Sequence, residues 1–208
     1  MAAEDQLREE ELDAFTIQSV LQRAGLSVGA FYSRFPDKTA LLHEMQGRVH
    51  KRIDSQILAD LAAQAEIATS LEEAVHRGFG TLIRHVLSER RVFRAFMMIS
   101  VFDPHMRQQG ERFNLERKRA IAELLAPYRE EIGHSDPDLA IDSAYAIYSS
   151  TMRGRLVYYG SASELQFGVT DEVLFGDLKQ SLTMFLRGSA PAPSAPSEAP
   201  ASKKGDRR

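Results

Sequence analysis

Apolar residues recur at spacings of three and four along most of the chain, and this periodicity predicts helices. The first well-marked segment opens at Phe15 and Thr16, with Thr16 as the expected N-cap, and runs to Ala24. Gly25 follows, and glycine is the residue that most readily closes a helix in the left-handed conformation. We therefore expect a short helix that ends at a defined turn.

A second, very short helix is expected immediately after this turn. Ser27 is its predicted N-cap, and the helix VGAFYSRF must stop near Phe35 because Pro36 disfavours helical geometry in the residue before it. Asp37 then caps a third, long helix. That helix carries one apolar stripe made of Leu41, Met45, Val49, Ile53 and Ile57.

Capping signals predict the remaining helices. Ser70 and Glu73 open one that runs to about Leu87, and Ser88 is expected to cap the next, over residues 89–102. A long helix follows Pro104 and ends around Pro127. Asp136 and Pro137 begin another that reaches Tyr159, and the last covers residues 170–187. No run of alternating β-branched residues competes with these helices, so the predicted fold class is all-α.

Composition limits the kind of protein that this chain can be. Of its 208 residues 43% are hydrophobic and 26% are charged, which is typical of a globular domain. The chain has no cysteine, no apolar run long enough to span a membrane and no secretory signal at its N-terminus. We therefore expect a cytoplasmic protein without a membrane partner. After Gly188 a stretch rich in Pro, Ala and Ser predicts a disordered tail over residues 188–208.

The charge is unevenly distributed, although the formal net charge is only −3. Acidic residues dominate positions 1–13. Basic residues dominate positions 14–52, which hold Arg23, Arg34, Lys38, Arg48, Lys51 and Arg52. An anionic partner is therefore expected to meet the second stretch.

Two short helices joined by a turn that contains glycine fit a helix-turn-helix, whose second helix enters the major groove of DNA. On a helical wheel Val28, Phe31 and Phe35 share one face, which is expected to pack against the preceding helix. Small residues, Gly29 and Ala30, then let the backbone approach the groove closely and contact a thymine methyl group. The spacing alone also fits two short helices of an ordinary helical bundle.

The string FTIQSVLQRAGLSVGAFYSRFPDKTALL resembles the helix-turn-helix of TetR-type one-component transcriptional repressors. The resemblance implies an all-helical homodimer that binds double-stranded DNA at a palindromic operator and releases it when a small-molecule effector binds. It implies backbone contacts from Thr16 and Gln18. It places Ser27, Gly29, Ala30 and Ser33 along the groove and assigns phosphate contacts to Tyr32, Arg34 and Lys38.

The N-terminus departs from the family pattern. The family begins with a basic arm and a first helix of about four turns, whereas only an acidic stretch precedes Phe15, and Glu11 stands where the family has glycine. Either the true start lies upstream or the protein lacks a full first helix. The alternative function is therefore a dimeric helical ligand-binding protein that has lost operator binding. The predicted domains are a DNA-binding domain (1–50), an effector-binding and dimerisation domain (51–187) and the tail.

Two surfaces of the second domain are predicted. Large apolar residues at helical spacing form either a plain core or an effector cavity, and the candidate cavity residues are Phe79, Ile83, Phe96, Met97, Phe113, Tyr145, Tyr148 and Met152. Arg153 and Arg155 are candidates for holding an acidic ligand or for ion pairs. Two helix faces are predicted to form a four-helix dimer interface or to pack within one subunit. The helix that begins at Asp136 contributes Ser143, Ala146, Ser150 and Gly154, and the last helix contributes Leu174, Leu178, Leu182 and Phe185.

The six histidines form no constellation that indicates catalysis, and no phosphate-binding glycine loop or nucleophile elbow occurs. His43 and His50, seven residues apart, do not by themselves make a metal site. A helical enzyme that uses Asp103 and His105 is the least favoured alternative. We predict that the protein is not an enzyme and uses no cofactor or metal.

Overall fold

The computed structural model describes residues 2–10, 12–158 and 168–188, and every element of regular structure in these ranges is helical. The elements, with η for 3₁₀ helices, are α1 (Ala2–Glu9), η1 (Leu12–Ala14), α2 (Ile17–Ala24), α3 (Val28–Tyr32), α4 (Lys38–Ile67), α5 (Leu71–Ser88), α6 (Arg90–Ser100), α7 (Pro104–Leu125), η2 (Ala126–Glu131), α8 (Pro137–Val157) and α10 (Asp171–Arg187). The all-α prediction is confirmed. Tyr159 and the predicted tail after Gly188 lie outside the described residues.

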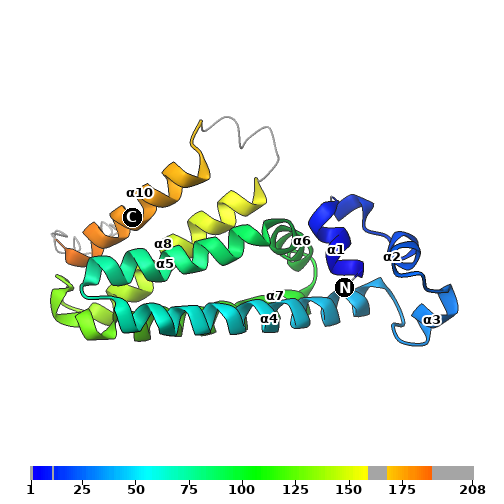
Figure 1. Ribbon diagram of the computed structural model, residues 1–208, viewed down its shortest axis with the longest axis horizontal. Coiled ribbons are helices and arrows are strands. Elements are labelled where there is room, and N and C mark those ends of the chain that lie inside the picture. The colour runs from blue at the N-terminus through cyan, green and yellow to red at the C-terminus, as the bar shows by residue number, and fades with distance from the viewer. Residues whose placement is uncertain (1, 11, 159–167, 189–208) are drawn as a thin grey trace, which may run out of the picture.

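The molecule is elongated, with α1, α2 and α3 gathered at one end and a helical bundle at the other (Figure 1). Helix α4 starts in the small N-terminal group and continues along the whole bundle, where it packs against α5 and α7. It passes through residue 50, the predicted domain boundary, without a break. A displacement of α4 would therefore be felt at both ends of the molecule.

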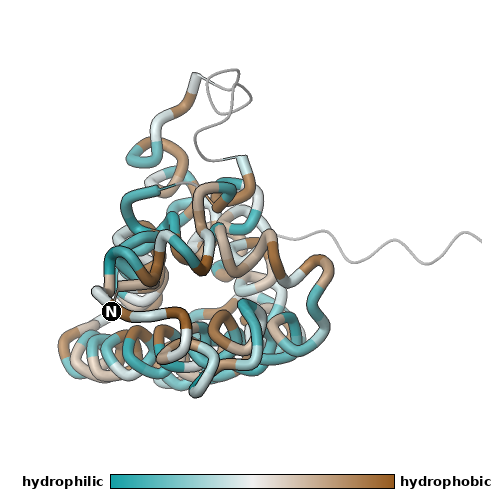
Figure 2. Tube along the Cα trace, turned by 90° about the vertical axis from the view of Figure 1, so that its right-hand side faces the viewer, coloured by the Kyte–Doolittle hydropathy of each residue, from teal (hydrophilic) through white to brown (hydrophobic). Residues whose placement is uncertain are grey.

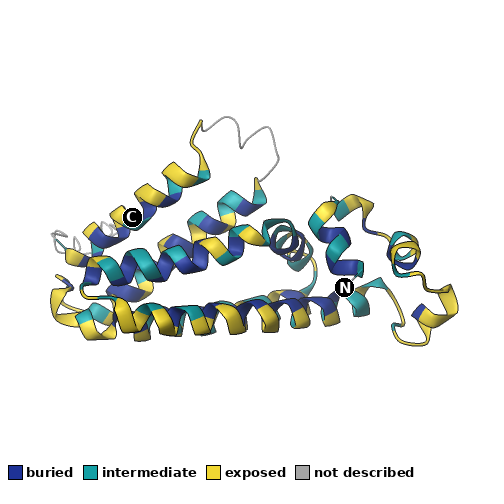
Figure 3. Ribbon diagram, viewed as in Figure 1, coloured by how far each residue is buried: buried dark blue, intermediate teal, exposed yellow. Residues whose placement is uncertain are grey.

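Helix α5 forms the centre of the bundle because its apolar positions extend around most of its circumference. It contacts α4 and α7 on one side and α10 on the other. Phe79 and Leu82 are completely buried. Figure 3 shows α5 almost entirely as buried and intermediate residues, whereas α3 is mostly exposed. Hydrophilic and hydrophobic positions alternate along the other helices (Figure 2), so each presents an apolar side to the core.

Helix termini are set by side-chain caps at nearly all the predicted positions. Asp37, Ser70, Asp103, Asp136 and Thr170 each accept a hydrogen bond from a backbone N–H in the first turn of the helix that follows. Such bonds satisfy donors that a helix cannot pair internally.

One predicted cap is wrong. Ser88 does not cap α6, because its hydroxyl donates to the carbonyl of His85 within α5. The N-cap of α6 is Glu89, whose side chain makes no capping bond. Its carboxylate is instead bound by two arginines, as described below, so an ion pair takes the place of a cap at this helix end.

Helices α8 and α10 pack together and leave one side of each open. On α8 the predicted strip is open: Ala146 and Ser150 are exposed, and Ser143 and Gly154 are half-buried. On α10 part of the prediction is wrong for the single chain, because Leu178 and Leu182 are buried in the chain's own core. Leu174 and Phe185 are half-buried and pack against that core. The open side of α10 instead carries Val173 and Met184.

None of the described helices combines the length and apolar character needed to cross a membrane.

Candidate DNA-binding surface and effector cavity

The turn between α2 and α3 is closed by specific backbone geometry. Gly25 has a φ of 64°, in the left-handed region, and its N–H bonds back to the carbonyls of Leu21 and Gln22. At the other end of α2, Thr16 and Ser19 form a reciprocal capping box. Ser27 caps α3 by accepting a hydrogen bond from the N–H of Ala30 at 3.2 Å. The local sequence therefore dictates both helix ends and the turn between them.

The outer side of α3 is exposed and free of bulky side chains. Ser27, Gly29, Ala30 and Ser33 all face solvent. A Cβ atom added to Gly29 would meet only the Ser27 hydroxyl oxygen, at 4.0 Å. An incoming DNA groove would thus meet the α3 backbone almost directly.

Only part of the predicted inner face of α3 is buried. Phe31 is the buried residue of α3, with 4% of its surface exposed. The centre of its ring lies 5.2 Å from the centre of the Tyr32 ring and 5.5 Å from that of the Phe35 ring. Val28 is 61% exposed, so its predicted inward orientation is wrong. Helix α3 ends at Tyr32, earlier than the predicted stop near Phe35, and its single regular turn buries only one large side chain.

The residues predicted to hold phosphates surround this helix. Tyr32 is 53% exposed. Arg34 is exposed and pairs with Glu44 at 2.9 Å, an exchangeable surface contact. Lys38 has a structural contact: its ammonium donates to the carbonyl of Phe15 and lies 5.2 Å from the centre of the Phe15 ring. Thr16 and Gln18 are exposed at the start of α2.

Acidic residues at and just after the end of α1 reduce the positive charge near the helix-turn-helix. Arg23 pairs with Glu9 at 2.7 Å and with Glu10 at 3.3 Å. Because Arg23 donates a hydrogen bond to the Glu9 carboxylate, its charged form is stabilised and the pKa of Arg23 is raised. The predicted basic stretch therefore offers fewer uncompensated charges than its sequence indicates.

A larger ion-pair network joins α1 to the bundle. The guanidinium of Arg8 donates hydrogen bonds to both carboxylate oxygens of Glu89, at 2.8 and 2.9 Å. Arg52 of α4 donates to the same carboxylate at 3.3 Å. Burial opposes the ionisation of Glu89, but its bonds to Arg8 and Arg52 outweigh this and its pKa is lowered. Glu4, which is buried, is contacted by Arg8 and Arg52 and lies 3.5 Å from Arg48. These bonds connect α1, α4 and the start of α6.

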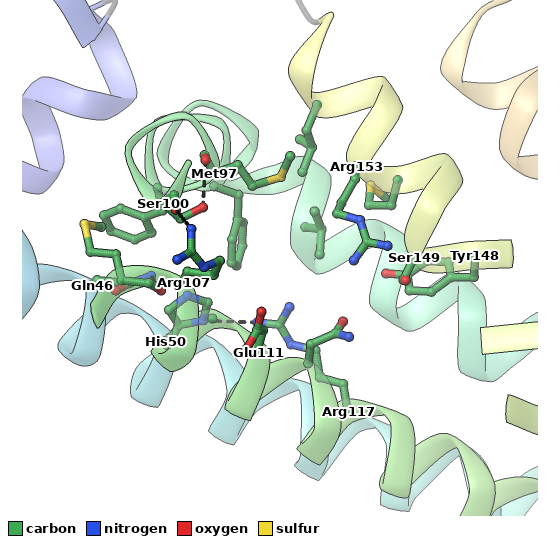
Figure 4. Close-up of a pocket in the computed structure, with 18 of the residues that line it drawn as sticks. Gln46, His50, Met97, Ser100, Arg107, Glu111, Arg117, Tyr148, Ser149 and Arg153 are labelled. Atoms are coloured by element: carbon green, nitrogen blue, oxygen red, sulfur yellow. Dashed lines mark hydrogen bonds between the residues drawn. The ribbon is translucent and has the colours of Figure 1, made fainter. Parts of the chain in front are cut away.

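A cavity of about 260 Å³ lies in the bundle, between α4, α6, α7 and α8. Aromatic and methionine side chains form most of its apolar wall: Phe93, Phe96, Met97, Met106, Tyr145, Tyr148 and Met152. Figure 4 shows polar side chains on two sides, with Gln46, His50, Glu111 and Arg117 from α4 and α7, and Tyr148, Ser149 and Arg153 from α8. Such a mixture of apolar walls and a few polar groups is typical of a small-molecule site.

A buried ion pair supports the α4–α7 wall of this cavity. Arg117 of α7 binds Asp54 of α4 at 2.6 Å through Nε and at 2.5 Å through Nη2. His50 lies beside this pair and stacks on Phe113 with ring centres 4.5 Å apart. Burial lowers the pKa of His50, so its imidazole is neutral at neutral pH.

Comparison with known proteins agrees with this architecture. Residues 1–45 match the family model of bacterial regulatory proteins of the tetR family. The chain has a TetR-type helix-turn-helix and a TetR-type fold. One similar solved structure is a protein assigned to the TetR family of transcriptional regulators from Mesorhizobium loti, with 17% identity, a TM-score of 0.67 and coverage of 89% of this chain and 91% of that one.

Two further TetR-family structures show the same likeness. The regulator from Rhodococcus sp. has 17% identity and a TM-score of 0.61, with 90% of this chain and 95% of that chain covered. PfmR from Thermus thermophilus has 18% identity and a TM-score of 0.56, with 91% and 97% covered. No curated protein sequence matches the chain. At these identities the likeness to the solved structures concerns the fold.

In this TetR-type bundle the predicted effector residues divide into two groups. Phe96, Met97, Tyr145, Tyr148 and Met152 line the cavity. Phe79, Ile83 and Phe113 do not line it: Phe79 packs behind Tyr148 with ring centres 5.3 Å apart, and Phe113 packs behind His50. Sequence reasoning missed the polar lining residues Gln46, His50, Glu111 and Arg117. A polar residue within an otherwise apolar helix face, as at Gln46 and His50 on α4, was the available signal.

The remaining charged and histidine candidates have structural partners. Arg155 pairs with Asp171 at 2.6 Å, whereas Arg153 lines the cavity. His43 bonds to Asp103 at 2.6 Å and stacks on His105, and Asp103 also caps α7. Across residues 2–10, 12–158 and 168–188 no group of three potential ligands gathers as a metal site.

Proposed function

We propose that this protein is a homodimeric transcriptional repressor that binds a palindromic operator through α3 and releases it when a small molecule occupies the bundle cavity. The observation that carries the proposal is the exposed, small-residue side of α3, held at a fixed turn from α2. Its TetR-type sequence and fold support the same conclusion.

Base contacts are assigned to the start of α3. Ser27, Gly29, Ala30 and Ser33 would face the groove, while Tyr32, Arg34 and Lys38 would hold phosphates, with Thr16 and Gln18 at the start of α2. Arg34 would exchange Glu44 for a phosphate. Lys38, already bonded to the Phe15 carbonyl, would approach the backbone where α2 begins.

Dimerisation is assigned to the open sides of α8 and α10. Ala146 and Ser150 give α8 a flat strip, flanked by Leu139 and Ile147, which are 63% and 43% exposed. Met184 of α10, 68% exposed, would extend it. Burying these apolar groups against a second copy would create a two-fold interface and place two α3 helices on one DNA duplex.

Release of DNA is assigned to α6. This helix supplies Phe93, Phe96 and Met97 to the cavity, and its N-cap Glu89 is bonded to Arg8 of α1. A ligand that displaces α6 would therefore act on α1, which in turn packs against α2. Ligand and DNA would then bind different arrangements of the same element, as allosteric coupling requires.

The test is selection of bound sequences from a random duplex library by the purified protein at two salt concentrations. We expect enrichment of a palindrome. Tyr32→Ala or Lys38→Ala should weaken binding to all sequences, each through a lost phosphate contact, whereas changes at Gly29 or Ala30 should alter the preferred sequence. Lys38→Ala with unchanged affinity and salt dependence would contradict the placement of α4 against the DNA backbone.

A second function has one specific observation in its favour. Arg23, next to the helix-turn-helix, is neutralised by Glu9 at the end of α1 and by the following Glu10, which weakens attraction for phosphates. A dimeric ligand-binding protein without operator binding would have this feature. No enrichment from the library, combined with ligand binding, would favour this alternative.

A further inference from the structure

The α8 wall of the cavity carries hydrogen-bond donors that the protein itself leaves unused. Tyr148 and Ser149 are 3% and 8% exposed, and both line the cavity. Neither hydroxyl has a hydrogen-bond partner in the part of the chain that the structure describes, whereas the neighbouring Tyr145 hydroxyl bonds to Asn114. Because both residues line the cavity, their hydroxyls are available to a polar group of a bound ligand.

A positive charge stands next to these two hydroxyls. Arg153 follows Ser149 by four residues, one helical turn, and is also a lining residue (Figure 4). Its guanidinium contacts only the Ser150 hydroxyl, at 3.4 Å, and no carboxylate of the described residues pairs with it. Burial raises the pKa of Tyr148, so its phenol stays protonated and acts as a neutral hydrogen-bond donor. This wall therefore presents donors and positive charge together.

The charge balance of the rest of the lining agrees with an anionic ligand. The lining contains Arg107, Arg117 and Arg153 but only one acid, Glu111. The charge of Arg117 is compensated by Asp54 behind the wall. Two arginines therefore remain against one glutamate.

The apolar part of the lining suits a ring. Phe93 and Phe96 of α6 face the space together with Met97, Met106 and Met152. Aromatic rings and thioethers pack well against an aromatic ligand. The volume of 260 Å³ exceeds the roughly 150 Å³ of an engineered cavity that accepts benzene. One ring with a short side chain fits this space.

We propose that the cavity binds a small aromatic carboxylate, with the carboxylate held by Arg153, Tyr148 and Ser149 and the ring against Phe93, Phe96 and the three methionines. This inference rests on the proposed effector role of the cavity and adds the chemical class of the ligand. An ionised acceptor between a guanidinium and two hydroxyls makes charge-assisted hydrogen bonds, which are the strong ones.

The probes are 3-phenylpropionate, its neutral isostere 3-phenylpropanamide, and octanoate, a carboxylate without a ring. Their binding to the full chain is measured by calorimetry in the absence of DNA. We expect 3-phenylpropionate to bind at least about tenfold more tightly than the amide. Octanoate should bind more weakly than 3-phenylpropionate. Octanoate binding more tightly would overturn the assignment of a ring, and equal binding of acid and amide would overturn the carboxylate site.

Variants locate the carboxylate. Arg153→Gln should weaken binding of the acid about 10- to 100-fold and remove the preference for acid over amide, while Tyr148→Phe should weaken it roughly 2- to 10-fold. Arg119→Gln removes an equal charge from an exposed position of α7 that does not line the cavity, and it should change nothing. A preference for the acid that survives Arg153→Gln would refute the assignment. Circular dichroism of each variant checks folding.

The ligand-binding experiment and the operator selection can fail independently of each other. A palindrome recovered with no binding of any probe at millimolar concentration refutes the ligand class and leaves the repressor. Binding of 3-phenylpropionate, lost in Arg153→Gln, with no sequence recovered supports the ligand class and refutes the repressor.

Discussion

The buried pair of Arg117 and Asp54 allows a quantitative test of how the α4–α7 wall is held. Arg117 is 8% exposed and Asp54 is 3% exposed, and their closest contacts are 2.5 and 2.6 Å. Asp54→Asn keeps the shape of the side chain but leaves the guanidinium charge buried without its counter-charge. Breaking such a pair usually costs about 3–5 kcal/mol. Because Arg117 also faces a 260 Å³ cavity that can admit water, we expect the lower end, about 3 kcal/mol.

The assay is urea denaturation followed by circular dichroism, at one fixed protein concentration because dimerisation would shift the apparent stability. If the free energy of unfolding falls by about 2.5 kcal/mol per molar urea, the urea concentration at the unfolding midpoint should fall by about 1 M. Asp60→Asn on the same helix is the matched control. The Asp60 side chain is 47% exposed and pairs with His85 at 2.8 Å, so its replacement should move the midpoint much less than that of the buried Asp54.

A double variant separates the cost of an unpaired charge from the value of the pair. Replacing both partners, Asp54→Leu with Arg117→Met, should recover most of the stability that Asp54→Asn loses. The reasoning fails if Asp54→Asn lowers the midpoint no more than Asp60→Asn does while the urea dependence stays constant.

Three further substitutions have directions set by the structure. Gly25→Ala should destabilise the protein by about 1 kcal/mol, because Gly25 has a φ of 64° while nothing lies within 4 Å of the added Cβ; thermal denaturation should show no loss for Gly29→Ala, where φ is helical. Glu89→Gln should lower stability by about 1 kcal/mol at pH 7. Because the pKa of Glu89 is lowered in the folded state, this contribution is complete above its unfolded value of about 4.3 and is lost as pH falls through the folded value. The unfolding free energies of the wild type and the variant, measured by urea titration, should therefore begin to converge as pH falls below about 4.3, and a constant gap would contradict the ion-pair explanation. Gly133→Ala should lower the melting temperature by several degrees, since the new Cβ would collide with the Arg187 carbonyl at the end of α10; an unchanged melting temperature would show that this helix end moves freely.

Helix ends were the feature best predicted from the sequence. Thr16, Gly25, Ser27, Asp37 and Asp136 all act at the termini expected of them. Caps and left-handed glycines act through bonds to residues three or four positions away, so the information is local. Ser88 failed as a cap because its hydroxyl donates to the His85 carbonyl, and the N-cap of α6 is Glu89, which Arg8, distant in sequence, binds.

Apolar stripes indicated burial but not the partner that provides it. Leu178 and Leu182 were expected between subunits and are buried within one chain, because α10 lies on α5 and α8. Val28 was expected inside and is exposed, because α3 is too short to present more than Phe31 to α2. Hydrophobic periodicity gives the direction of a side chain from its helix, and the neighbouring helix decides what that side chain meets.

The cavity shows the same division. Its apolar residues on α6 and α8 were partly predicted, whereas the polar wall from α4 and α7 was not, since Asp54 and Arg117 lie 63 positions apart. By itself the sequence determined the helices, their caps, the short turn and the small residues of α3, because these depend on interactions within a few residues. Only the tertiary structure decided which stripes are core, which charges are paired and which hydroxyls face a cavity without a partner, because these depend on how distant helices pack together.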